Sequence, residues 1–148
     1  MNALIDKLII NEKNLSNLSR IKSRTNFKHN NHVCRWALVV SLLIKNEPPP
    51  INKSSNVNIS PIEWNTFVGK YGPLYLSLLR SRLKASKIKE NKDNLENELA
   101  KHVTRGLTTI ASNKNIGYSS YRHPELPDYP VRNCHLLLKE YLGKKLSK

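Results

Sequence analysis

The chain has 148 residues, of which 25 are Lys or Arg and 11 are Asp or Glu, so its formal net charge at pH 7 is +14. This length fits one domain with a possible tail, and the charge favours a polyanionic partner such as nucleic acid. Two cysteines are too few for a disulfide framework, which excludes the disulfide-stapled class of secreted proteins. The first ten residues lack the pattern of a signal peptide, so we expect a cytoplasmic protein.

The positive charge is uneven along the chain. Residues 1–46 carry a net +6, residues 47–87 carry +4, residues 88–112 are neutral and residues 113–148 carry +4. The neutral segment is therefore predicted to pack against other parts of the protein.

A helix is predicted to begin at Glu12, because Asn11 is a typical N-cap and Leu15, Leu18 and Ile21 recur with helical spacing. Residues 1–10 before it fit a short strand or a frayed helix, and their pattern does not choose between the two.

Basic residues follow the outer side of this helix. Arg20, Arg24 and Lys28 recur every four residues, which on a continuing helix would stack three cations that repel one another unless they hold an anion. The alternative is an ordinary solvated surface. We predict contacts to DNA phosphates from four residues, namely Arg20, Lys22, Arg24 and Lys28.

The most apolar run of the chain is residues 33–44, which is too short to span a bilayer. Its apolar residues cover nearly the whole circumference of a helix, which predicts a buried core helix or an oligomer interface. Asn30 or Asn31 is the predicted N-cap, and the three prolines at 48–50 end the helix near Lys45. The residues predicted for the core or interface are Val33, Trp36, Val40 and Leu43.

Arg35 interrupts this apolar run. It is expected either to pair with a carboxylate, with Glu63 as the candidate, or to reach solvent along its aliphatic stem. Trp36 and Trp64 are predicted to be core residues, with base stacking as the alternative.

Shorter elements are predicted in the second half. Residues 56–59 alternate like a strand, residues 60–63 have the pattern of a capped helix start, and this short helix ends near Gly69. Another helix begins at Gly72 and carries a second set of cations, which are either DNA contacts or charges favoured at a helix C-terminus. This set comprises Arg80, Arg82, Lys84 and Lys87.

A longer amphipathic helix is predicted to begin with a capping signal at Asp93 and to end near Ser112. Gly106 inside it predicts a close neighbouring backbone. Residues 113–133 contain prolines and tyrosines without a helical period and are predicted to form an extended arm, followed by a short helix and a basic tail.

No catalytic or metal site is predicted. The five histidines and two cysteines lack the ligand spacing of a zinc site, and no phosphate-binding glycine loop occurs, so we expect no cofactor and no enzymatic activity.

Several segments, in this order, resemble the DndE family of DNA phosphorothioation (sulfur modification) proteins over residues 8–111. The resemblance implies a mainly α fold with a ribbon-helix-helix-like N-terminal half and at most a short strand or two, assembled as a homo-oligomer, commonly a tetramer. The segments are LSRIKSRTNF, HVCRWALVVSLL, PPP, SNVNIS, WNTFVGKY, LYLSLLRSRL and HVTRGLTTIA.

The resemblance also implies a function. Family members bind duplex DNA with a preference for nicks, and their partners are an ATP-pyrophosphatase-like iron–sulfur protein and an ATPase that insert sulfur. Lys22 and Arg24 match positions carried over as DNA contacts, whereas Asn26 stands where the family usually has glycine.

We therefore expect residues 1–112 to form a helical DNA-binding domain and residues 113–148 to form an arm and a short helix. The predicted function is a non-catalytic, DNA-binding subunit of the phosphorothioation machinery. The alternatives are a ribbon-helix-helix repressor or antitoxin, and an adaptor whose cations meet an acidic protein.

Overall fold

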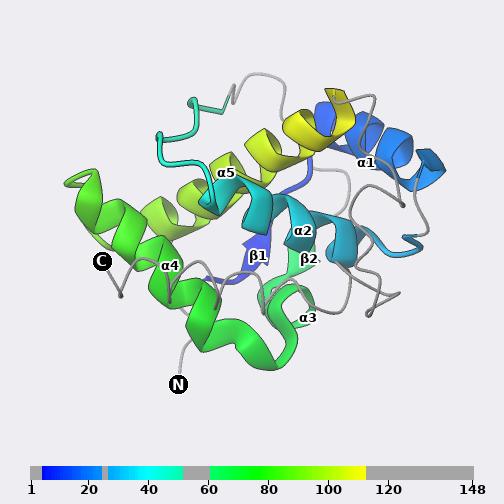
Figure 1. The fold of residues 1–148 in the computed structure, drawn as a ribbon. Helices are drawn as coiled ribbons and strands as arrows, with labels where there is room; N and C mark the ends of the chain where they lie inside the picture. The colour runs from blue at the N-terminus through cyan, green and yellow to red at the C-terminus, as the bar shows by residue number, and fades with distance from the viewer. Residues whose placement is uncertain (1–4, 25–26, 52–60, 113–148) are drawn as a thin grey trace, which may run out of the picture.

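The computed structural model describes residues 5–24, 27–51 and 61–112 (Figure 1). The described part is mostly helical with one short antiparallel sheet, as the sequence predicts, and none of its helices is long and apolar enough to cross a membrane. The predictions for residues 56–59 and 113–148 lie outside it. The elements are β1 (Lys7–Leu8), α1 (Glu12–Arg24), α2 (Asn30–Leu42), β2 (Ile62–Glu63), α3 (Trp64–Val68), a 3₁₀ turn (Gly69–Tyr71), α4 (Gly72–Ala85) and α5 (Lys92–Ser112).

The sheet joins the start of the chain to its middle. β1 pairs antiparallel with β2, with Lys7 opposite Glu63 and Leu8 opposite Ile62. Glu96 on α5 accepts a hydrogen bond from the Asp6 backbone N–H at 2.8 Å, which ties the strand to α5 as well. Of the two alternatives for this segment, the strand is therefore correct at Lys7–Leu8, and its pairing partner lies in the same chain.

Two predictions about α1 are confirmed. The Asn14 backbone N–H donates to Asn11 Oδ1 at 2.8 Å, which is the hydrogen bond of an N-cap. Leu18 and Ile21 are buried and Leu15 is partly buried, so the predicted inner face does pack on the core.

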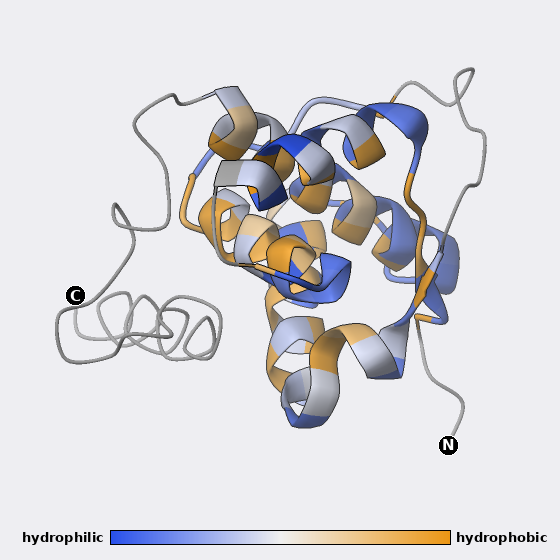
Figure 2. Ribbon diagram, turned by 90° about the vertical axis from the view of Figure 1, so that its right-hand side faces the viewer, coloured by the Kyte–Doolittle hydropathy of each residue, from blue (hydrophilic) through white to orange (hydrophobic). Residues whose placement is uncertain are grey.

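The centre of the core is the contact between α2 and α5, which lie against each other (Figure 1). The helices of the described part carry their hydrophobic residues on faces that turn toward the interior (Figure 2). A Cβ at Gly106 of α5 would lie 1.9 Å from the backbone oxygen of Ala37 on α2, so only glycine permits this approach. The close neighbouring backbone predicted at Gly106 is therefore present. The neutral segment is the main packing element, also as predicted.

α2 is apolar around nearly its whole circumference, and most of this surface is covered by the same chain, because α5, α3 and α1 all pack on it. Val33 and Trp36 are buried, and the ring of Phe27 stacks on Trp36 with 5.0 Å between centroids. Val40 is only partly buried and Leu43 is 41% exposed, so these two residues lie at the edge of the core. Trp64 is buried too, so both tryptophans belong to the core.

The predicted caps of α2 and α5 are wrong. His29 is the N-cap of α2 and makes no side-chain capping bond, so neither Asn30 nor Asn31 has that role. α5 is capped by Asn91, whose Oδ1 accepts from the Asn94 backbone N–H at 2.8 Å, so the cap lies two residues before the predicted one at Asp93.

The helix start predicted at residues 60–63 is also wrong. Ile62 and Glu63 pair with β1, and α3 begins only at Trp64. The capping pattern of residues 60–63 is local, whereas the pairing with β1 is a long-range contact that sequence spacing cannot reveal. The long-range contact determines the conformation here.

α4 ends in a turn that removes Lys87 from the helix. The backbone N–H groups of Ile88 and Lys87 donate to the carbonyls of Leu83 and Lys84, at 2.9 and 3.1 Å, which is the Schellman pattern. Lys87 has φ = +58°, in the region that glycine favours. Of the second set of cations predicted on this helix, Arg80, Arg82 and Lys84 lie on α4, whereas Lys87 lies beyond its end.

Candidate nucleic-acid interface

The first set of predicted DNA contacts is divided between two segments. α1 ends at Arg24, so Lys28 lies in the connection to α2 and the three cations do not stack on one helix. Arg20 and Lys28 are exposed and Lys22 is half-buried, whereas the side chain of Arg24 lies outside the described part.

Lys22 and Lys28 meet in an open groove of about 450 Å³, which we call the basic groove. The end of α1 and the start of α2 form one side of it, and β2 with the start of α3 forms the other. Glu63 is the acidic residue among those that line it. The lining residues are Lys22, Lys28, His29, Asn30, Asn31, Pro61, Ile62, Glu63 and Thr66.

One hydrogen bond places a cation at the N-terminus of α2. Lys22 Nζ donates to Asn30 Oδ1 at 3.0 Å, which fixes the ammonium group beside the first residue of this 13-residue helix. The first turn of α2 contains no acidic residue. The N-terminal N–H groups and the helix dipole favour an anion, so the basic groove has the chemistry of a phosphate site.

Two histidines flank this position. The rings of His29 and His32 meet edge to face with 5.3 Å between centroids. Burial lowers the pKa of His32, and the nearby charges of Arg35 and His29 lower it further. His32 is therefore neutral near pH 7, and the lysines supply the fixed positive charge.

Arg35 has a structural contact in place of the predicted ion pair with Glu63. Its Nε donates to the backbone oxygen of Phe67 at 2.9 Å. Phe67 lies in the last turn of α3, where a carbonyl without a helical partner favours a cation.

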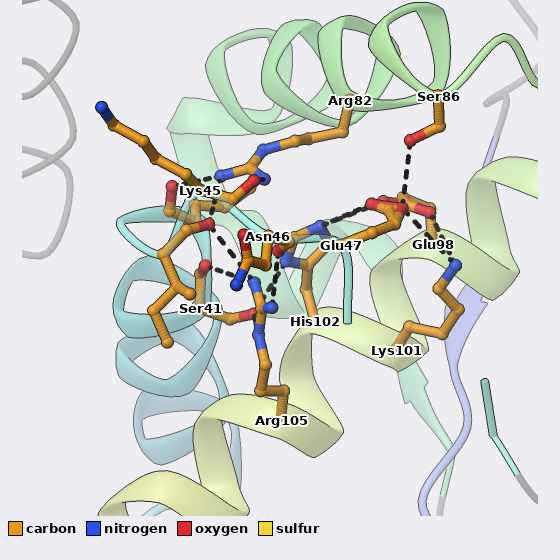
Figure 3. Close-up of polar contacts among 12 residues, drawn as sticks. Ser41, Lys45, Asn46, Glu47, Arg82, Ser86, Glu98, Lys101, His102 and Arg105 are labelled. Atoms are coloured by element: carbon orange, nitrogen blue, oxygen red, sulfur yellow. Dashed lines mark hydrogen bonds and ion pairs between the residues drawn. The ribbon is translucent and has the colours of Figure 1, made fainter. Parts of the chain in front are cut away.

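The second set of predicted DNA contacts is also divided. Arg82 crosses from α4 and donates to the backbone oxygens of Leu42 and Ile44, at 2.6 and 2.8 Å, so its guanidinium caps the C-terminus of α2 (Figure 3). Arg80 forms a 3.0 Å ion pair with Glu90. Lys84 and Lys87 are exposed, and the hollow that Arg80, Lys84 and Glu90 line does not include Lys87.

A polar cluster that was not predicted from the sequence joins the inner side of α5 to α2. We call it the α5 relay, and it consists of Arg105, His102 and Glu98 of α5 with Ser41 of α2. Arg105 Nε donates to Ser41 Oγ at 2.8 Å, Ser41 Oγ lies 2.8 Å from His102 Nδ1, and His102 Nε2 lies 3.0 Å from a Glu98 oxygen (Figure 3). The spacing of Glu98, His102 and Arg105 on one helix face was the available signal.

His102 and Glu98, the two buried titratable groups of the α5 relay, have shifted pKa values. Burial lowers the pKa of His102. The hydrogen bond and the charge of Glu98 raise it, whereas the charges of Arg82 and Arg105 lower it, so the pKa stays below its usual value. Burial alone would raise the pKa of Glu98, but hydrogen bonds with His102 and Glu47, together with the charge of Lys101, lower it to about 2. At neutral pH a neutral imidazole thus lies beside a carboxylate.

These residues also offer three ligand atoms that a metal ion would need. The ligand atoms of Glu47, Glu98 and His102 lie within 4.8 Å of one another. Lys101 Nζ, however, lies 3.3 Å from Glu98 and 3.6 Å from Glu47, so an ammonium group already supplies the positive charge. Glu47, Glu98, Lys101 and His102 are better described as a structural contact that holds the segment after α2 against α5.

Residues 7–117 match the family model described as DNA sulphur modification protein DndE. The chain belongs to the DndE family. A solved DndE structure has the same fold: the crystal structure of DndE from Escherichia coli B7A involved in DNA phosphorothioation modification matches with a TM-score of 0.58 and 17% sequence identity, over 73% of this chain and 98% of that one. No curated protein matches the sequence. The DndE match covers the whole described fold apart from its first two residues and ends at residue 117, so the arm predicted for residues 113–148 lies almost entirely beyond it.

Proposed function

We propose that this DndE-family chain is the DNA-binding subunit of the DNA phosphorothioation machinery and binds duplex or nicked DNA through its phosphates. The observation that carries the proposal is the Lys22–Asn30 contact, which sets a cation at the open N-terminus of α2 in the basic groove. The net charge of +14 and the family's place in DNA sulfur modification support the same conclusion.

The groove suits a phosphate group more than a base. The donors of the groove are Lys22, Lys28 and the first N–H groups of α2, and they are not arranged to match the hydrogen-bonding edge of a base. Contacts to phosphates carry no sequence information. We therefore expect recognition of backbone shape or of a nick, with little sequence preference. Each phosphate that a lysine neutralises releases counterions, so binding should weaken steeply with salt.

We further propose that the chain is non-catalytic and acts as a homo-oligomer, commonly a tetramer in its family. In this arrangement the chemistry belongs to the ATP-pyrophosphatase-like iron–sulfur protein and the ATPase of the pathway, and several copies of the basic groove hold one DNA. The exposed Leu43 at the end of α2 is a candidate contact between copies.

The repressor or antitoxin alternative requires a strand that pairs between two copies of the chain. β1 is two residues long and pairs with β2 of its own chain, which weighs against that alternative.

A binding titration tests the proposal. Nicked, intact and single-stranded DNA of one sequence are titrated at two salt concentrations, with fluorescence anisotropy as the readout. We expect the nicked and intact duplexes to bind most tightly and to lose affinity steeply with salt. Equal, weak binding to all three probes would contradict recognition of a nick or of duplex shape.

Lys22→Ala tests the groove itself. Losing one phosphate contact should weaken binding for every sequence and reduce the slope of log K against log salt by about 1. Lys13→Ala is the matched control, since Lys13 is an exposed lysine on the same helix about two and a half turns away. Equal effects of the two substitutions would show that only the net charge matters.

A further inference from the structure

A second hollow, of about 260 Å³, lies between the first turn of α1 and the first half of α5. Its lining differs from that of the basic groove, because it contains the carboxylates of Asp93 and Glu96 and no Lys, Arg or His. The remaining lining consists of side-chain amides, one threonine and apolar residues. We call it the acceptor pocket.

A buried acceptor in this pocket lacks a donor. Asn14 lines the pocket and is only 2% exposed. Its Nδ2 donates to Thr104 Oγ1 at 3.2 Å, but its Oδ1 has no hydrogen-bond partner among the described residues. An unpaired buried acceptor is costly, so this atom points to a ligand that donates hydrogen bonds.

The carboxylates indicate the charge of that ligand. Asp93 forms no salt bridge in the described part of the chain, and only one oxygen of Glu96 accepts hydrogen bonds there, from the start of β1. Two carboxylates without a lining cation disfavour a phosphate and favour a positively charged donor. The acceptor pocket is therefore negatively charged, although the whole chain has a net charge of +14.

We propose that the acceptor pocket binds a guanidinium or primary ammonium group carried on an aliphatic stem. The head group would donate to Asp93, Glu96 and Asn14, and the methylene groups of the stem would lie against apolar lining residues such as Ile9, Ile51 and Ala100. An arginine or lysine side chain of a partner protein and a small free amine share this chemistry. The proposal uses none of the residues of the basic groove and does not depend on DNA binding.

The experiment follows the ¹H–¹⁵N spectrum of the full chain during titration. The probes are n-butylguanidinium for the free cation, N-acetyl-arginine-N-methylamide for the side chain in a peptide, and n-butylurea as the neutral ligand of the same shape. We expect saturable shifts at Asn14, at Asn97 and in the first half of α5 with the cations only. Tighter binding of the arginine derivative than of butylguanidinium would identify a protein side chain as the preferred source, and the reverse order would identify a free amine.

Two variants locate the site. Asp93→Asn removes an exposed charge and should weaken binding about fivefold or more. Ala100→Leu narrows the pocket without changing its charge and should abolish binding. Glu90→Gln is the matched control, because it removes a nearby exposed carboxylate that pairs with Arg80 outside the pocket. The proposal is overturned if butylurea binds as well as the cations, if none of the probes gives saturable shifts, or if Glu90→Gln weakens binding as much as Asp93→Asn.

Discussion

At the scale of single residues, the α5 relay accounts for a buried histidine next to a buried acid. With a neutral His102, Nε2–H can donate to Glu98 while Nδ1 accepts from Ser41, whose oxygen in turn accepts from Arg105. Every polar group in this chain of contacts then has a partner, which a buried cluster requires. A proton added to Nδ1 would reverse the contact with Ser41, because the hydroxyl oxygen would then accept from both His102 and Arg105 and its own proton would lose its acceptor.

This arrangement predicts a pH dependence of stability. The pKa of His102 is lowered from 6.5 in the folded protein, so the unfolded chain takes up a proton first as the pH falls through 6.5. The free energy of unfolding should therefore decrease below about pH 6.5, and it should decrease further between about pH 4.5 and 2, where Glu98 remains ionised only in the folded state. The raised pKa of Glu47 acts in the opposite direction, because the folded state then holds its proton more tightly, and offsets part of the second decrease.

Urea denaturation between pH 7.5 and 5.5 measures the first effect. His102→Gln keeps a neutral hydrogen-bonding side chain and should flatten this part of the profile. His32→Gln is the control, since His32 is less buried and should account for a smaller share. A His102→Gln protein that keeps the full wild-type pH dependence would refute the assignment.

At the scale of elements, the packing of α2 on α5 depends on the absence of a side chain at Gly106. In an exposed helix, replacing glycine by alanine stabilises by about 1 kcal/mol. At Gly106 the added Cβ would meet the backbone of Ala37 at 1.9 Å, and a backbone cannot move aside as a flexible side chain can. The two helices would have to separate.

We therefore expect Gly106→Ala to lower the free energy of unfolding by about 1–3 kcal/mol, the usual cost of overpacking, instead of raising it. Thermal and urea denaturation give this value. Thr108→Ala, at an exposed position of the same helix, should leave stability within about 0.5 kcal/mol of the wild type. A stabilised Gly106→Ala protein would show that the helices are not in close contact.

Features that belong to a single helix could be predicted from the sequence. Helical spacing correctly predicted the inner faces of α1 and α5, the burial of α2 and the close approach at Gly106, because these depend on local periodicity and on one residue's lack of a Cβ. It failed at the N-cap of α2, and at residues 60–63, where the pairing of β2 with β1 decided the conformation. The strand pairing depends on a contact between segments that are distant in the sequence.

The candidate site was predictable only in part, for the same reason. The charge of Lys22 and Lys28 could be read directly from the sequence, but their positions in one groove are visible only in the folded chain. Arg82, in contrast, is as basic as its neighbours, and only the folded chain directs it to the end of α2. Charge alone does not separate a structural cation from a binding one.

At the scale of the whole molecule, the apolar surface left by the fold bears on assembly. Leu43 is 41% exposed at the end of α2, beside the partly buried Val40. A contact between copies would cover both residues. Leu43→Asp tests this contact between copies without disturbing the fold, since an exposed side chain can be replaced by a charged one without unfolding a monomer.

We expect light scattering to give a multiple of the 17.0 kDa chain mass for the wild type and a smaller species for Leu43→Asp, with an unchanged circular dichroism spectrum. Leu76→Asp, at a partly buried position of α4, is the comparison for a charge that disturbs the fold itself. A wild-type protein with the mass of one chain would exclude the oligomer.

The central claim is that a DNA phosphate lies in the basic groove at the N-terminus of α2. A structure of the protein bound to a nicked duplex tests it most directly. A phosphate oxygen should lie about 3 Å from Lys22 Nζ and from at least one of the first N–H groups of α2. A complex with Lys22 and Lys28 far from every nucleotide, and the DNA on another face, would contradict the claim.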